Sequence, residues 1–118
     1  MKFFQIEDTH IDLEKIDFIQ EEPQHQQAAP MIVVYYIGRH FRIRSDSPKW
    51  TELQALLPST YLRIQGAHID VREIAYVREE AQSQGQPLCV IYYHDRELRI
   101  VKGSSEWNEL VAVMYPEA

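Results

Sequence analysis

Two stretches of the chain share one pattern of apolar and polar positions. The first runs from Met31 to Arg44, MIVVYYIGRHFRIR, and the second runs from Leu88 to Val101, LCVIYYHDRELRIV. In each stretch an apolar run of β-branched and aromatic residues precedes a tight polar turn. A second run, which alternates apolar with basic residues, follows that turn. The pattern predicts an antiparallel β-hairpin in each stretch.

The two hairpins belong to a longer internal repeat. When the two His-Ile-Asp motifs are aligned, HIDLEKIDFIQEEPQHQ matches HIDVREIAYVREEAQSQ, and after a one-residue deletion Trp50 meets Trp107. Self-similarity over nearly the whole chain indicates a tandem duplication. We predict a single compact domain, residues 1–118, made of repeats 3–58 and 61–116 that form a pseudo-twofold pair.

Each repeat is expected to fold in the order β-β-β-β-α. Short first strands at 3–6 and 61–64 are followed by a slip in the phase of the apolar positions, which predicts a turn from Asp12 to Lys15 and from Asp70 to Glu73. The next strands are 16–22 and 74–80, and the hairpin supplies two more. Glutamine-rich loops at 21–30 and 79–87 are expected to be irregular and exposed.

A short amphipathic helix is predicted at the end of each repeat. Ser47 is placed to cap the first helix, and Pro48 fits its first position, where a missing N–H costs nothing. Trp50 and Trp107 open the apolar stripes of the two helices, so we expect both rings to be buried in the core. The predicted class is α+β, with antiparallel sheets and one helix per unit.

The apolar runs 31–37 and 88–93 do not alternate, although an antiparallel strand with one face in water should. Both faces of the sheet are therefore expected to be covered at these strands. The helix covers one face. The other face needs the second repeat or another chain, since a contiguous exposed apolar patch marks an interface. A homodimer is one way to meet that need.

Composition limits the function and the setting. The formal net charge is -6, which argues against broad attraction to nucleic acid or to anionic membranes. Cys89 is the one cysteine, so no intramolecular disulfide forms, and its position predicts a small buried residue. The chain lacks an apolar run near the roughly 18 residues of a membrane-spanning helix, and it begins without a secretory pattern. We expect a cytoplasmic protein.

An Ile-Asp turn before a strand, a hairpin with a polar turn and a terminal helix recur in each unit. In the first unit these features are carried by Ile11, Asp12, Ile16, Ile19, Gly38-Arg39 and the helix from Ser47 to Leu57. The pattern resembles the small bacterial FlbD-like proteins linked to flagella and swarming motility. The resemblance implies the same strand-and-helix topology for each unit, whereas the duplication and the glutamine-rich loops depart from that family.

Histidine and aspartate occur together twice, as His10 with Asp12 and as His68 with Asp70. Such a pair can act as a base with its orienting group, or as metal ligands. No nucleophile or third ligand lies at useful spacing, and an aspartate before a phase slip is typical of a turn cap. We therefore predict no catalytic, cofactor or metal site. A small-molecule or metal-dependent enzyme would have to gather these four residues.

Basic residues and tyrosines gather on the two hairpins. The expected interaction residues are Tyr36, Arg39, Arg42, Tyr93, Arg96 and Arg99. Basic side chains among aromatics can bind phosphates and stack bases, which leaves a nucleic-acid-binding module as an alternative. Acidic residues on strands 16–22 and 74–80 can instead pair with Arg42 and Arg99. We expect a non-enzymatic protein-interaction or regulatory module, which acts through a sheet face or edge strands and binds a protein or a second copy of itself.

Overall fold

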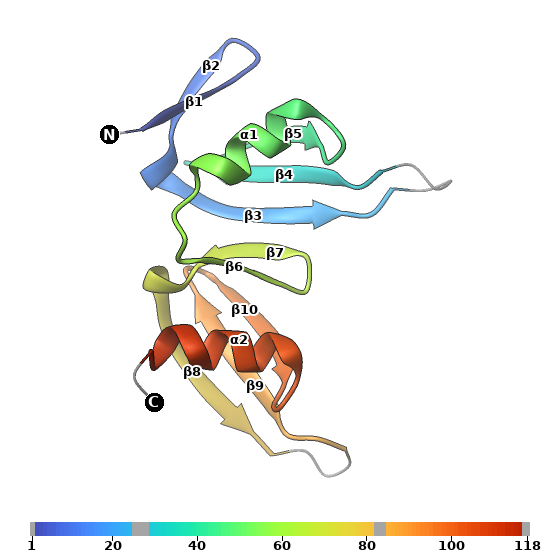
Figure 1. The fold of residues 1–118 in the computed structure, drawn as a ribbon, viewed down its shortest axis with the longest axis vertical. Helices are drawn as coiled ribbons and strands as arrows, with labels where there is room; N and C mark the ends of the chain where they lie inside the picture. The colour runs from blue at the N-terminus through green and yellow to red at the C-terminus, as the bar shows by residue number, and fades with distance from the viewer. Residues whose placement is uncertain (1, 25–28, 82–84, 117–118) are drawn as a thin grey trace. The chain divides into compact units, whose positions relative to one another are not determined.

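The protein combines antiparallel sheets with two helices (Figure 1), and the computed structural model describes residues 2–24, 29–81 and 85–116. The first series of elements is β1 (Phe3–Ile6), β2 (Thr9–Asp12), the 3-10 helix η1 (Leu13–Lys15), β3 (Ile16–Glu22), β4 (Met31–Tyr36), β5 (Arg39–Arg44) and α1 (Pro48–Leu56). The second series is β6 (Tyr61–Ile64), β7 (Ala67–Asp70), η2 (Val71–Glu73), β8 (Ile74–Glu80), β9 (Leu88–Tyr93), β10 (Arg96–Val101) and α2 (Ser105–Met114). The α+β class and the antiparallel sheets are confirmed.

Each series has one strand more than the predicted β-β-β-β-α order. The extra strands are β2 and β7, and each follows the preceding strand after a two-residue turn. Glu7 and Gln65 open these turns with φ angles of 55° and 52°, in the left-handed region. An alternation of four residues is too short to distinguish from the turn that follows it, so the sequence pattern indicated only a break.

The chain divides into two compact units that differ slightly from the predicted repeats. Unit 1 consists of Met1–Pro58 together with Gly66–His68, and unit 2 consists of Ser59–Gln65 together with Ile69–Ala118. Three residues of the second series thus belong to unit 1 by their contacts. Each unit is described separately below.

In unit 1, β5, β4 and β3 form an antiparallel sheet in that order, and β1 pairs with β2. The outer edge of β3 is also paired, because Ile19 lies opposite His68 and Gln20 lies opposite Ala67. The helix α1 packs against β5. Apolar side chains of β4 are fully buried, as its continuous apolar run predicts: Ile32, Val33 and Val34.

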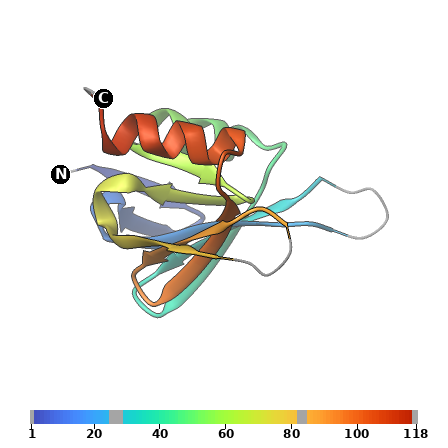
Figure 2. The same cartoon turned by 90° about the horizontal axis from the view of Figure 1, so that it is seen from below.

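In unit 2, the antiparallel sheet has the order β10-β9-β8, so among the described residues β8 is an edge strand. The helix α2 contacts β10, β6 and η2, and Figure 2 shows it along one side of the β8–β10 sheet. Cys89 on β9 is fully buried, as predicted, and burial raises the pKa of its thiol. A raised pKa keeps the thiol protonated and unreactive at neutral pH.

The predicted turns after the His-Ile-Asp motifs are confirmed as capped 3-10 helices. The Asp12 carboxylate accepts a hydrogen bond from the backbone N of Glu14, and the Asp70 carboxylate accepts one from that of Arg72, both at 3.1 Å. Burial of Asp70 acts to raise its pKa, but hydrogen bonds from Arg72 and Thr60, together with the charge of Arg72, outweigh burial and leave the pKa lowered. Both aspartates therefore act as turn caps.

The helix starts are also as predicted, although the two caps differ. Ser47 occupies the N-cap of α1, with Pro48 after it, but its hydroxyl donates to the carbonyl O of Arg44 at 2.8 Å. Ser104 caps α2 by accepting from the backbone N of Trp107 at 3.2 Å. The predicted glutamine-rich loops lie partly outside the described residues, at 25–28 and 82–84.

Candidate interaction surface

Two of the arginines predicted on the hairpins, Arg42 and Arg99, form ion pairs within their own units. Arg42 pairs with Glu22 at 3.5 Å in unit 1. In unit 2, Arg99 lies 3.4 Å from Glu97 and 3.9 Å from Glu80. Surface pairs of this kind add about 0–1 kcal/mol each to stability, but they offset the positive field that a phosphate backbone would require.

The predicted tyrosines anchor turns. The hydroxyl O of Tyr36 accepts from the backbone N of Asp12 at 3.0 Å, and that of Tyr93 accepts from Asp70 at 3.3 Å. Tyr93 is only 1% exposed, so its ring does not belong to an accessible surface. Arg39 and Arg96 are exposed where β5 and β10 begin. Of the predicted interaction residues, Tyr93 is thus inaccessible, whereas Arg39, Arg42, Arg96 and Arg99 remain exposed.

The two histidines of the His-Ile-Asp motifs have different surroundings. In unit 1, Nε2 of His68 lies 2.6 Å from Oε2 of Glu21, and the His68 ring meets Trp50 edge to face at 5.0 Å. His10 lies exposed on β2. Among residues 2–24, 29–81 and 85–116, no group of three or more His, Cys, Asp or Glu side chains is arranged to hold a metal ion.

A different surface emerges on unit 2, at the outer edge of β8. Within the described part of the chain, β8 pairs with β9 on one side and no strand pairs with it on the other. An edge of this kind presents backbone N–H and C=O groups that can pair with another polypeptide. In unit 1 the corresponding edge of β3 is occupied by Ala67 and His68.

An open groove lies next to this edge, between β8 and α2. Its volume is about 700 Å³, and the residues that matter below are among its lining: Ile74, Tyr76, Val77, Glu79, Trp107 and Met114. The groove combines apolar walls with one carboxylate, a mixture typical of sites that receive a side chain or ligand.

The groove and edge residues are more exposed than their sequence counterparts in unit 1. Phe18 is 3% exposed, whereas Tyr76, which the repeat alignment places opposite it, is 56% exposed. Trp50 is 7% exposed, whereas Trp107 is only partly buried. The prediction that both tryptophans are core residues is therefore correct for Trp50 and wrong for Trp107. The two tryptophans differ in exposure because the outer edge of β3 is paired with β7, whose His68 contacts Trp50.

The predicted site residues did not include this surface. The one available signal was Tyr76 in place of Phe18. A tyrosine hydroxyl can hydrogen-bond to water, so a tyrosine is better suited to an exposed position than a phenylalanine. Sequence cannot show which strand lies at an edge when the pattern of two strands is nearly the same.

Comparison with known proteins gives no relative from which to transfer a function. No protein-family model matches the chain, and neither the curated proteins nor the solved structures include a significant match. Neither helix in the described residues is long and apolar enough to cross a membrane.

Proposed function

We propose that the chain is a tandem duplication of one β-rich unit and serves as a non-enzymatic protein-interaction module, with β8 and the adjoining groove as its binding surface. The partner is an extended polypeptide segment that adds to the outer edge of β8 and places a side chain in the groove beside Trp107. Strand addition of this kind draws affinity from backbone hydrogen bonds and specificity from side-chain pockets.

One observation carries this proposal: the equivalent edge of β3 is already paired in this way. The backbone N of Glu21 donates to the carbonyl O of Gly66 at 2.7 Å, and the His68 ring packs on Trp50. The alignment places Glu79 opposite Glu21 and Trp107 opposite Trp50. Unit 2 thus has, at Glu79 and Trp107, the residue types that contact the added segment in unit 1. The resemblance to FlbD-like proteins stays a prediction about the unit topology.

The nucleic-acid alternative has less support. It needs the arginines of the hairpins as phosphate contacts, and Arg42 and Arg99 face carboxylates of their own unit. Binding through phosphate contacts would fall steeply with salt. A titration with single- and double-stranded DNA and RNA at low ionic strength distinguishes this alternative from binding along β8.

The test of the proposed function is a selection from a phage-displayed library of random linear peptides on the immobilised full chain. Affinities of the enriched peptides are then measured by calorimetry for the wild type, for Glu79→Pro and for Trp107→Ala. Proline at position 79 removes an N–H from the β8 edge, so we expect at least a tenfold loss of affinity, which is about 1.4 kcal/mol.

Circular dichroism of Glu79→Pro verifies that the variant is folded, and Glu79→Gln is the matched control that removes the charge but keeps the N–H. Peptides that bind Glu79→Pro and the wild type equally well would overturn the proposal. Absence of any enriched peptide would overturn it too.

A further inference from the structure

We infer that the segment bound by β8 belongs to a second copy of this chain and is its β1–β2 hairpin. This inference rests on the function proposed above, because it assigns a partner to the same edge and groove. It follows from three correspondences: in the segment that binds, in the edge that receives it, and in the charges that meet between them.

The binding segment has a model within unit 1. There, Gly66, Ala67 and His68 lie along β3, with His68 opposite Ile19 and Ala67 opposite Gln20. The contact is completed by the hydrogen bond from Glu21 N to Gly66 O at 2.7 Å and by the 2.6 Å pair of His68 with Glu21. A three-residue segment thus supplies backbone pairing, a polar side-chain contact and an aromatic contact.

The repeat alignment places Asp8, Thr9 and His10 opposite Gly66, Ala67 and His68. These residues lie at the end of the β1–β2 hairpin, where Thr9 is opposite Ile6 across a two-residue turn. Among the described residues, β2 pairs with β1 alone, so its other edge is open. The first residues beside such a turn pair with each other, and the backbone N–H of the next residue, His10, then points outward. The imidazole of His10 is exposed as well.

The receiving edge matches in the same way. Val77, Arg78 and Glu79 correspond to Ile19, Gln20 and Glu21. The strands β8 and β3 also keep equivalent registers with their inner neighbours, each with one irregularity near the start. Because Glu21 N–H points away from β4, the N–H groups of Glu79 and, two residues earlier, Val77 are expected to point away from β9. His10 of the second copy would then meet Glu79 and the ring of Trp107.

Two positions that differ between the repeats complement each other in charge. Gly66 lies close to Gln20 in unit 1, since a Cβ on Gly66 would come within 3.3 Å of the Gln20 side-chain nitrogen. Asp8 replaces that glycine in the hairpin, and Arg78 replaces that glutamine on β8. The Asp8 carboxylate of one copy would thus lie near the Arg78 guanidinium of the other. Opposite charges across an interface favour one register over others.

Charged residues on β8 have a simpler reading, since charges often protect edge strands from aggregation. Against that reading, β3 carries Gln20, Glu21 and Glu22 at the matching positions and is nevertheless paired. Charge at these positions therefore does not prevent strand addition in this chain.

Because the hairpin and the β8 edge are different surfaces, the association is head to tail. Such heterologous contacts produce either a closed ring or an open chain of copies. Each copy contributes one hairpin and one edge, so blocking either surface should end the series.

The experiment is sedimentation velocity on the full chain, on His10→Pro, on Glu79→Pro and on an equimolar mixture of the two variants. We expect the wild type to form a concentration-dependent series of oligomers and each variant alone to be monomeric. The mixture should form one-to-one dimers and nothing larger, because it retains one intact hairpin and one intact edge. Formation of that dimer also shows that the hairpin of Glu79→Pro and the β8 edge of His10→Pro are correctly folded. His10→Ala and Glu79→Gln, which keep the backbone N–H groups, should weaken association only partly.

A wild-type chain that stays monomeric at about 1 mM, which corresponds to less than about 4 kcal/mol of association free energy, would overturn the inference. So would variants that associate like the wild type, or a mixture that stays monomeric. If selected peptides still bind a monomeric wild type and not Glu79→Pro, the proposed function stands while the second copy is excluded as its partner. If neither peptides nor a second copy bind, both proposals fail.

Discussion

Replacing Trp50 by alanine is expected to lower the free energy of unfolding by about 3–5 kcal/mol, the usual effect of removing a large buried aromatic side chain. Trp50 is 7% exposed, and its ring meets that of His68 at 5.0 Å. The matching change in unit 2, Trp107→Ala, should cost much less, because Trp107 lines an open groove and is only partly buried. Urea denaturation followed by circular dichroism measures both values.

The pair of tryptophans is a matched comparison, since both open the apolar stripe of a helix at equivalent positions. Trp107→Ala should weaken peptide binding while it leaves most of the stability intact. Equal losses of stability for the two variants would show that the groove is closed in solution, which would contradict the proposed surface.

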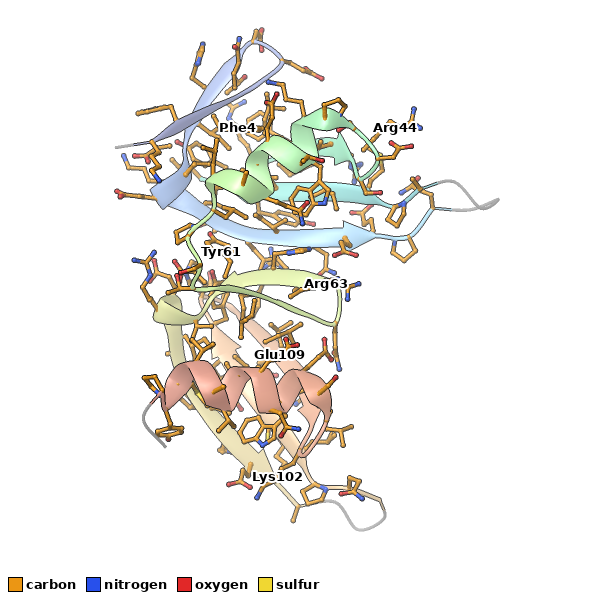
Figure 3. The ribbon with its side chains drawn as sticks, in the orientation of Figure 1. Phe4, Arg44, Tyr61, Arg63, Lys102 and Glu109 are labelled. Atoms are coloured by element: carbon orange, nitrogen blue, oxygen red, sulfur yellow. The ribbon has the colours of Figure 1, made fainter. Side chains whose placement is uncertain are left out.

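The second large effect is expected from proline in the two equivalent strands β3 and β8. Glu21→Pro removes the N–H that donates to Gly66 O at 2.7 Å, which leaves a ladder acceptor unsatisfied at a cost of about 1–3 kcal/mol before any strain. Glu79→Pro removes an N–H that faces no strand in the described residues. The loss of stability should stay below about 1 kcal/mol, the value of a surface ion pair. The pair that is lost with the carboxylate joins Glu79 to Lys102, which is labelled in Figure 3.

Thermal and urea unfolding of the two proline variants, each beside its glutamine variant, separates the backbone effect from the loss of charge. The difference between Glu21→Pro and Glu21→Gln should be large, and that between Glu79→Pro and Glu79→Gln small. The reverse order would mean that β8 is paired on both sides and that β3 is not.

Much of the secondary structure follows from local patterns in the sequence. The apolar runs of β4 and β9 favour strands through their β-branched and aromatic residues, and the phase slips after Asp12 and Asp70 mark capped turns. The structure confirms each of them. The strands β2 and β7 were missed because four residues carry little periodicity. Their pairing depends on left-handed turn residues, Glu7 and Gln65, that are not glycine or asparagine.

The candidate surface was not predictable in the same way. Trp50 and Trp107 have the same local sequence signal, and their exposures differ because a segment from the second series, Gly66–His68, belongs to unit 1. Burial of an edge depends on such a non-local partner, which the sequence of the strand itself does not encode. The basic residues on the hairpins attracted attention by composition, yet Arg42 and Arg99 are engaged with carboxylates.

Amide hydrogen exchange of Glu21 and Glu79, measured by NMR on dilute wild-type protein, tests the central claim most directly. We predict strong protection for Glu21, whose N–H is bonded to Gly66, and near-unprotected exchange for Glu79, with protection of Glu79 appearing when a selected peptide or more protein is added. Equal protection of both amides in dilute protein without peptide would contradict an open edge on β8.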